Sequence, residues 1–324
     1  MPEIRLWTRY GGSAVRFSRF DDSRILVGTR DLFNSGLGLH VLQLCPTPWG
    51  GSAINEVATF RTVSGVNDCC WSQSHQSLAV SALTDGTVKL WDTSLPPAPQ
   101  PTSIFREHSG EVRSVDWNPA GDCFLSASSD ATIKFWTPGR CNSYYTFQEH
   151  TDKVNAVAWN AIQPHVFASA SDDYTVGLWD VRDSRFLTHI NVCHPGGLAS
   201  CNWNKYSEFL LATASGTSIR VWDIRTTQMP LVDFSSHRRN VCRICFSPHR
   251  ANVLLSCSVD YTVRTWDIQA QASIATYNLH DDSVYGIDMS VHAADLIASV
   301  GRDNVVNVWR ASPSHQRLQH FSHL

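Results

Sequence analysis

Residues 150–180 read HTDKVNAVAWNAIQPHVFASASDDYTVGLWD and carry the pattern that decides the fold. Three short apolar runs, at 154–159, 166–171 and 175–179, are separated by polar or proline-containing breaks. The apolar residues tend to alternate within each run, which is the two-residue period of a β-strand. The stretch therefore predicts three consecutive strands joined by short connections.

The same unit recurs along the chain. Successive repeats end in tryptophans that are 45, 43, 43, 44 and 43 residues apart: Trp91, Trp136, Trp179, Trp222, Trp266 and Trp309. Aspartate follows four of these tryptophans, at positions 92, 180, 223 and 267. A period of about 43 residues with a Trp-Asp ending is typical of the WD-repeat β-propeller, in which each blade has four strands.

A seventh, degenerate repeat precedes these six. SAVRFSRF, RILVGTR and LHVLQL, within residues 13–44, are interpreted as its strands, with Gln43 at the place of the tryptophan. The remaining segment EIRLWTR, at 3–9, is predicted to be the outer strand of the blade that carries Trp309, because closing the ring removes open sheet edges. We expect one all-β, seven-bladed domain over 1–324, with repeats at about 13–44, 57–92, 104–137, 146–180, 189–223, 232–267, and 275–310 plus 3–9.

Four residue types keep the same register in most repeats: a His before the first strand, a Ser in the second, an Asp in the next turn and the Trp in the third. Tryptophan has one N–H donor and ionised aspartate only accepts, so Ser and His between them complete a hydrogen-bonded chain. Because the set repeats, we interpret it as architecture and not as a catalytic triad. The complete sets are His108, Ser126, Asp130 and Trp136; His150, Ser169, Asp173 and Trp179; His237, Ser256, Asp260 and Trp266; and His280, Ser299, Asp303 and Trp309.

Composition argues against several classes of protein. The net charge is −3 and no dense Lys/Arg run occurs, which disfavours nucleic acid as a partner. No run of about 18 apolar residues predicts a membrane span, and the first residues lack a signal-peptide core. Cys242 and Cys245 form a CxxC, but in a strand these positions face opposite sides. We therefore expect no metal site and no cofactor, and interpret the 10 cysteines as thiols in a reducing compartment.

The propeller predicts a binding module, because no nucleophile–base pair stands outside the repeat and no glycine-rich phosphate loop is present. We therefore expect no enzyme activity. Residues just before the first strands and in the aspartate turns should share one rim of the ring. Those residues are Asp68, Glu111, Lys153, Asn155, Arg239, Asn240, Asp282 and Tyr285, with Thr84, Ser129, Asp172 and Arg302 from the turns.

Several segments go beyond the generic repeat: GSAVRFSRFDDSRILVGT (12–29), GLHVLQL (38–44), CWSQSHQSL (70–78), DGTVKLWDTSLPP (85–97), REHSGEVRSVDWNP (106–119), SCNWNKYSEFLLAT (200–213), CFSPHRANVLLSCSVDYTVRTWD (245–267) and YGIDMSV (285–291). With these segments, the chain from about residue 12 to 310 resembles the receptors for the type 2 peroxisomal targeting signal, which are seven-bladed WD-repeat peroxins. The degenerate first repeat with its HVLQL strand is characteristic of that family.

The resemblance implies a receptor for a signal near the N-terminus of cargo enzymes, of the form Arg/Lys-Leu, five residues, His/Gln-Leu. Such receptors carry cargo from the cytosol to the peroxisome, or to the glycosome where one exists. They act with a co-receptor, the long form of the tetratricopeptide-repeat peroxin or a dedicated fungal partner, and with the peroxisomal docking complex. The signal is expected to bind as an amphipathic helix across the top of the propeller.

A helix with leucines and one strong cation needs an apolar groove and a carboxylate near one end. We expect Asp68 and Glu111 to lie side by side on the rim of adjacent blades and to pair with the basic residue of the signal. Lysine at either position should then leave stability nearly unchanged. The full predicted signal-binding set is Asp68, Glu111, Asn155, Arg239, Asn240, Asp282 and Tyr285.

Two weaker matches lead elsewhere. WDVR at 179–182 and WDIR at 222–225 fit the WDxR pattern of substrate adaptors of a cullin-type ubiquitin ligase, which is the alternative function. Co-purification with a ligase scaffold would favour that alternative. The last residues, Ser322-His323-Leu324, resemble a type 1 peroxisomal signal, although such tripeptides often arise by chance.

Overall fold

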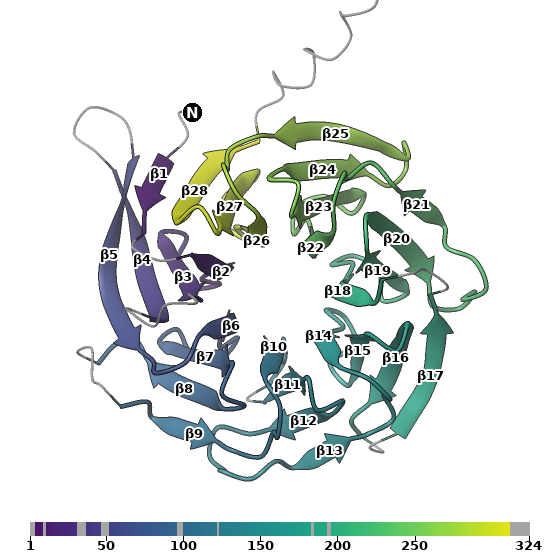
Figure 1. The fold of residues 1–324 in the computed structure, drawn as a ribbon, viewed down its shortest axis with the longest axis horizontal. Helices are drawn as coiled ribbons and strands as arrows, with labels where there is room; N and C mark the ends of the chain where they lie inside the picture. The colour runs from purple at the N-terminus through teal and green to yellow at the C-terminus, as the bar shows by residue number, and fades with distance from the viewer. Residues whose placement is uncertain are drawn as a thin grey trace, which may run out of the picture.

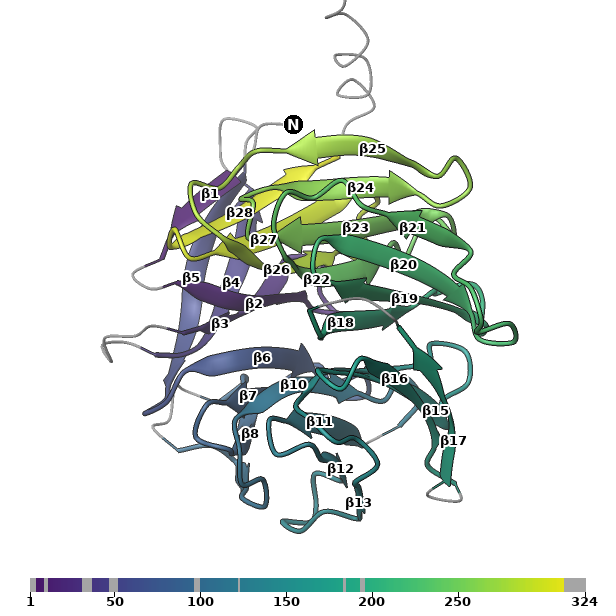
Figure 2. The ribbon, with the colours of Figure 1, turned by 45° about the vertical axis from the view of Figure 1, so that its right-hand side comes forward.

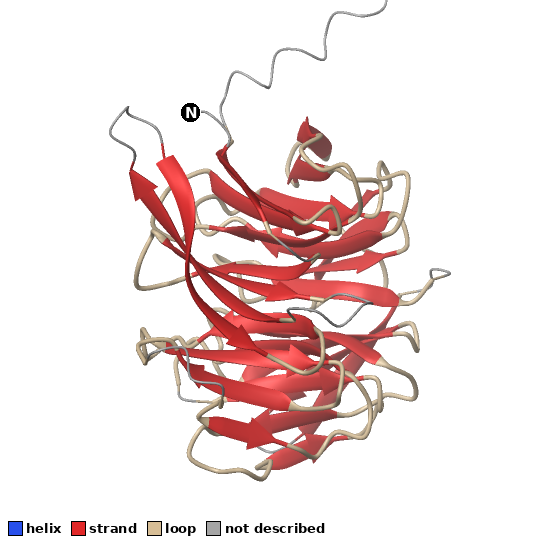
Figure 3. Cartoon of the chain, turned by 60° about the vertical axis from the view of Figure 1, so that its left-hand side comes forward, coloured by secondary structure: helices blue, strands red, loops and turns tan. Residues whose placement is uncertain are grey.

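The computed structural model describes residues 4–8, 11–30, 37–46, 52–95, 100–121, 123–182, 185–192 and 196–311. Within these ranges the regular elements are β-strands (Figure 3). No helix in the described ranges is long and apolar enough to cross a membrane. The Ser322-His323-Leu324 match lies outside the described residues.

Seven four-stranded antiparallel sheets surround a central axis (Figure 1). The first is β2 (Gly12–Phe17), β3 (Arg24–Thr29), β4 (Gly38–Pro46) and β5 (Ser52–Arg61). The second is β6 (Val66–Trp71), β7 (Leu78–Leu83), β8 (Val88–Asp92) and β9 (Ser103–Phe105). The third is β10 (Val112–Trp117), β11 (Phe124–Ser128), β12 (Ile133–Trp136) and β13 (Tyr145–Phe147).

The remaining sheets continue the ring in chain order. The fourth is β14 (Val154–Trp159), β15 (Val166–Ser171), β16 (Thr175–Asp180) and β17 (Arg185–Asn191). The fifth is β18 (Leu198–Trp203), β19 (Leu210–Ser215), β20 (Ser218–Asp223) and β21 (Val232–Phe234). The sixth is β22 (Val241–Phe246), β23 (Val253–Ser258), β24 (Val263–Asp267) and β25 (Ala272–Tyr277).

The seventh sheet joins the two ends of the chain. It contains β26 (Val284–Met289), β27 (Leu296–Gly301), β28 (Val305–Arg310) and, on its outer side, β1 (Ile4–Trp7). Ile4 lies opposite Val308 and Trp7 lies opposite Val305 in an antiparallel pair. The innermost strand of each sheet contacts that of the next, and β26 contacts β2. The predicted seven-bladed propeller, closed by its N-terminal strand, is confirmed.

Sequence repeats and sheets are offset by one strand. The repeat at about 104–137 includes β9, yet β9 pairs with β8 in the preceding sheet. Each repeat thus supplies the outer strand of one sheet and the inner three strands of the next, as Figure 2 shows around the rim. Apolar side chains pack between neighbouring sheets, for example Val80 and Phe105 of the second against Trp117 and Phe124 of the third. Each large side chain buried in this way stabilises the fold by about 1.5–3 kcal/mol.

The first sheet departs from the prediction at one position. Leu42 lies opposite Ile25, as Trp91 lies opposite Ala79 in the second sheet. Leu42 is fully buried, whereas Gln43 is only half-buried. The assignment of Gln43 to the tryptophan position is therefore wrong by one residue, because neighbouring side chains in a strand point to opposite faces. In this sheet the Leu42 side chain occupies the position that the tryptophan indole has in the second sheet.

The repeated polar set forms a hydrogen-bonded chain. In the third sheet Trp136 Nε1 donates to Ser126 Oγ (2.8 Å), which lies 2.7 Å from His108 Nε2, and His108 Nδ1 lies 2.9 Å from Asp130. Burial raises the pKa of Asp130, but hydrogen bonds from His108 and Thr132 outweigh burial and hold this pKa well below its usual range. The same chain joins His150, Ser169, Asp173 and Trp179, and His237, Ser256, Asp260 and Trp266.

The seventh sheet carries an incomplete chain. His280 lies 2.7 Å from Ser299 Oγ and 2.9 Å from Asp303. Trp309 Nε1, however, is buried and has no acceptor among the described residues. In the second and fifth sheets, the bond of this set that the described residues retain is that of the tryptophan, from Trp91 to Ser81 and from Trp222 to Thr213, each 2.9 Å.

This difference supplies a matched pair of variants. Trp179→Phe is expected to lose about 1 kcal/mol more of the free energy of unfolding than Trp309→Phe, because only Trp179 donates a hydrogen bond that the variant loses. The two side chains are similarly buried, at 1% and 6% exposure. Urea unfolding of both variants measures the difference, and equal losses would show that the bond to Ser169 adds nothing.

Candidate functional site

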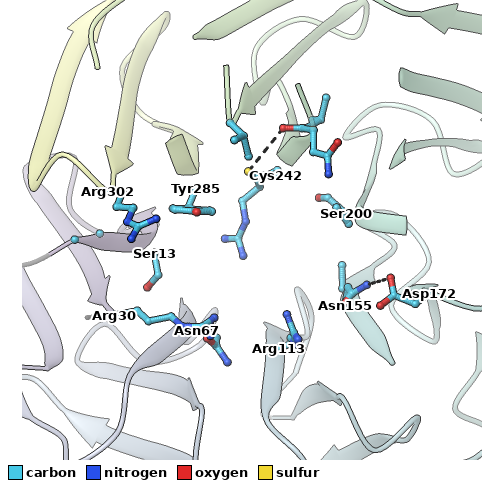
Figure 4. Close-up of a pocket in the computed structure, with 18 of the residues that line it drawn as sticks. Ser13, Arg30, Asn67, Arg113, Asn155, Asp172, Ser200, Cys242, Tyr285 and Arg302 are labelled. Atoms are coloured by element: carbon cyan, nitrogen blue, oxygen red, sulfur yellow. Dashed lines mark hydrogen bonds between the residues drawn. The ribbon is translucent and has the colours of Figure 1, made fainter. Parts of the chain in front are cut away.

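Each innermost strand carries a β-bulge at the same place. The pairing register shifts between the first and third residues of the strand, as between Val66 and Asp68 in β6, so that one residue is left unpaired. The seven unpaired residues are here called the bulge ring: Ser13, Asn67, Arg113, Asn155, Ala199, Cys242 and Tyr285. All of them line an upper cavity of about 840 Å³ at the end of the channel (Figure 4).

Among the residues that directly follow the bulge, Ala156, Ser200 and Arg243 also line this cavity and form its floor. One ion pair crosses that floor, between Arg243 Nη2 of the sixth sheet and Asp68 Oδ1 of the second, at 2.8 Å. On the seventh and first sheets, which lie between them, the corresponding residues are small, Gly286 and Ala14. A Cβ at Gly286 would lie 2.7 Å from Val300 Cγ2, so this position tolerates no side chain.

Asp68 is saturated with partners. Its Oδ2 accepts hydrogen bonds from Ser114 Oγ (3.0 Å) and from the backbone N–H of Val115 (3.3 Å). Arg16 lies 3.8 Å from Oδ1, and the Asp68 side chain is 1% exposed. The expectation that Asp68 lies on the rim is wrong, because the bulge places Asn67 at the rim and turns Asp68 into the channel wall.

Glu111 does lie at the rim, with 36% of its side chain exposed. Its Oε2 is 3.9 Å from Arg30 Nη2 and 3.7 Å from Arg113 Nε, which is longer than a direct hydrogen bond. Arg113 Nε instead donates to Ser129 Oγ at 2.9 Å. Glu111 is therefore a rim carboxylate that its cationic neighbours hold only loosely.

The structure brings half of the other predicted rim residues to the upper cavity: Asn155, Asp172, Asn240, Tyr285 and Arg302. Asn155 Nδ2 donates to Asp172 Oδ1 at 2.7 Å and to the Leu198 carbonyl oxygen at 2.9 Å. Tyr285 is 38% exposed. Asn240 and Arg302 also line the cavity. The described residues that line it do not include Arg239, which is exposed, or Asp282, which is half-buried. Thr84, Glu111, Ser129 and Lys153 are not among them either.

Sequence reasoning did not identify several lining residues, namely Ser13, Arg30, Asn67, Arg113, Cys242 and Arg243. A signal for part of the bulge ring was present. Arg113, Asn155, Cys242 and Tyr285 each follow the histidine of a complete polar set by five positions. Because that histidine is at a constant place, this spacing locates the bulge in those four repeats.

The cavity wall is chemically divided. Apolar groups come from the fifth to seventh sheets, in Ala199, Val241, Cys242, Val259 and Tyr285. Arginines come from the first, third, sixth and seventh sheets, in Arg30, Arg113, Arg243 and Arg302, and Figure 4 shows Arg113 beside Asn155. The mouth therefore combines an apolar wall with arginines that are spread around the ring.

The two cysteines of the CxxC are separated by the floor. Cys242 lines the upper cavity, whereas Cys245 lines a lower cavity of about 440 Å³. Burial, with Asp288 nearby, raises the pKa of the Cys245 thiol to about 11. Within the described part of the chain, no group of three His, Cys, Asp or Glu side chains is placed to hold a metal ion.

The WDxR segments have a local pairing. Arg182 Nη2 lies 2.5 Å from Asp180, and Arg225 Nη2 lies 2.6 Å from Asp223. In both segments the arginine therefore pairs with the aspartate of its own motif.

Comparison with known proteins identifies the repeat and the family. The model of the WD domain, G-beta repeat, matches residues 55–92, 99–137, 141–180, 186–223, 228–267 and 271–310. The human peroxisomal targeting signal 2 receptor is 32% identical over 85% of both chains, and the mouse receptor is 33% identical over 80% of this chain and 81% of the relative. The chain belongs to the family of peroxisomal targeting signal 2 receptors.

A plant relative in this family is more similar still. Peroxisome biogenesis protein 7 of Arabidopsis thaliana is 42% identical over 93% of this chain and 95% of its own length. The strands β2 to β4 of the degenerate first sheet lie outside the residues that match the generic repeat. The similarity to the plant relative, in contrast, extends over 93% of this chain. The predicted family resemblance is confirmed, and a member of this family is a receptor and not an enzyme.

Proposed function

We propose that this member of the receptor family binds the type 2 signal of cargo proteins over its upper cavity and serves in their import into the peroxisome. The signal is the helix Arg/Lys-Leu, five residues, His/Gln-Leu. The observation that carries the proposal is a cavity mouth with an apolar wall, beside the rim carboxylate of Glu111, in a chain 42% identical to a peroxisome biogenesis protein.

The geometry suits an amphipathic helix, whose apolar face needs a groove. The leucines of the signal would pack on the apolar wall that includes Cys242, Val259 and Tyr285. The basic residue would pair with Glu111, whose side chain is 36% exposed. Its Oε2 is buried without a hydrogen-bond partner among the described residues, and its two arginine neighbours lie 3.7 and 3.9 Å away, beyond direct hydrogen-bond distance.

Polar rim residues would complete the contact. Asn155 and Asn240 line the mouth, while Arg239 and Asp282 lie beyond it and would meet the ends of the helix. We assign no signal contact to Asp68, which is buried below.

Delivery requires further partners. By its family, the chain would act with a tetratricopeptide-repeat peroxin co-receptor in its long form, or an equivalent partner, and with the peroxisomal docking complex. It would move between cytosol and peroxisome, or glycosome in an organism that has one. The relatives named as peroxisomal targeting signal 2 receptors support this assignment.

A pair of peptides tests the proposal. A helix with the Arg-Leu, five-residue, His-Leu pattern is expected to bind about tenfold more tightly than the same peptide with its first Arg changed to Glu. Fluorescence anisotropy with purified receptor measures both affinities. Equal binding of the two peptides would reject recognition of the type 2 signal.

A further inference from the structure

Positive charge gathers in the upper cavity beyond what signal binding explains. Arg30, Arg113, Arg243 and Arg302 line it, whereas the acidic residue in the described lining is Asp172. The Asp172 carboxylate already accepts a hydrogen bond from Asn155 Nδ2, at 2.7 Å. A ligand that enters the centre of the mouth therefore meets mainly guanidinium groups.

The protein's own carboxylates leave part of this charge unmatched. Asp68 pairs with Arg243, although Arg243 Nη1 is buried with no acceptor among the described residues. Arg30 and Arg113 share the single carboxylate of Glu111 at long distance. The Arg302 side chain is exposed and forms no hydrogen bond or ion pair with any residue the structure describes.

The upper cavity lies at the rim end of the channel. The Arg243–Asp68 pair crosses the channel between this cavity and the lower one, and Ala156, Ser200 and Arg243 line both. Figure 4 shows Arg302, Arg30 and Arg113 around the upper cavity, on the seventh, first and third sheets. An anionic group that a polypeptide partner at the rim carries would therefore meet these arginines first.

We propose that the arginine-lined upper cavity is a carboxylate subsite, which receives one acidic side chain from the five-residue spacer of the bound signal. This inference rests on the proposed function. Guanidinium groups are planar forks that match a carboxylate in a bidentate geometry. A nine-residue helix is about 13 Å long, so when its ends engage the edge of the mouth its spacer lies over the centre.

The subsite also orients the signal. The centre of the mouth repels the basic residue, which must remain at the edge beside Glu111. An acidic spacer residue on the inward face of the helix is attracted to Arg302 and Arg113. Charge in the spacer therefore sets a preference among cargo signals without changing the Arg-Leu and His-Leu ends.

A glutamate walk tests the subsite. The parent peptide has the Arg-Leu and His-Leu ends with five alanines between them, and glutamate replaces each alanine in turn, with a glutamine peptide as the partner of each. At one or two positions the glutamate peptide is expected to bind about fivefold more tightly than its glutamine partner. Arg302→Gln should bring this ratio to about one.

The controls separate this inference from the proposed function. Arg250 lies in the loop after β22, pairs with Asp295 and does not line the upper cavity. Arg250→Gln should therefore leave the ratio of glutamate-peptide to glutamine-peptide affinity unchanged. If the parent peptide binds but the ratio is one at all five positions, the carboxylate subsite is wrong and receptor function stands. The same result is expected if a co-receptor supplies the carboxylate. If the parent peptide does not bind, the proposed function fails and this subsite with it.

Discussion

Replacing Asp68 with alanine is expected to lower the free energy of unfolding by about 3–5 kcal/mol, because it leaves a buried cation without its partner. Arg243 reaches Asp68 across the channel at 2.8 Å, and its side chain is only 14% exposed. Arg16 also loses a partner; burial lowers its pKa, but nearby carboxylates led by Asp68 outweigh burial and raise it, so it stays charged. The variant therefore leaves two arginines poorly compensated inside the ring.

Urea unfolding of the intact chain measures this loss. The control is Glu111→Ala, an exposed acid beside two arginines, which should change stability by no more than about 1 kcal/mol. Adding Arg243→Met to Asp68→Ala should recover part of the loss, since the uncompensated charge is removed. An unchanged unfolding midpoint for Asp68→Ala would contradict the role of the ion pair.

Glu111→Lys is expected to weaken binding of the type 2 signal peptide about tenfold or more, with nearly unchanged stability. The variant removes the rim carboxylate and adds a third cation beside Arg30 and Arg113. A basic ligand then meets repulsion where it met attraction, and like-charge contacts at an interface cost several kcal/mol. Fluorescence anisotropy gives the affinity, and thermal unfolding of the free receptor gives the stability.

A charge swap makes this result specific. The peptide with its first Arg changed to Glu should bind Glu111→Lys more tightly than it binds the unchanged receptor. Asp22→Lys, a reversal at an exposed position in the β2–β3 loop, should bind the parent peptide normally. If Glu111→Lys keeps its affinity for the parent and shows no gain for the swapped peptide, the basic residue binds elsewhere.

Glu111 and Asp68 show how far strand patterns predict a site. Both come near the start of an innermost strand, and the repeat places both near one end of the channel. Glu111 precedes β10 and stays at the rim, whereas Asp68 follows the bulge of β6 and is buried. A prediction from the two-residue period takes no account of the bulge. The extra residue of the bulge shifts the alternation by one, so the side chains after it point to the opposite face of the sheet.

Trp309 and Leu42 show the same limit within the repeats. The spacing correctly places Trp309 in β28. It does not predict that Trp309 Nε1 lacks an acceptor among the described residues, because that depends on side-chain positions in the folded sheet. Leu42 fills the tryptophan position of the first sheet, where the sequence suggested its neighbour. Both differences concern which side-chain atoms face each other in the folded sheet, and the spacing of strands along the sequence does not predict this.

The sequence by itself determined the all-β class, the number of sheets, the N-terminal closing strand and the hydrogen-bonded sets within single repeats. These features depend on the strand period and on the spacing between successive tryptophans, which are local properties of the chain. The tertiary structure alone decided the upper cavity and the Arg243–Asp68 pair. The cavity collects residues from all seven sheets and the ion pair joins two sheets that are not neighbours, so closure of the ring sets the distances between these residues.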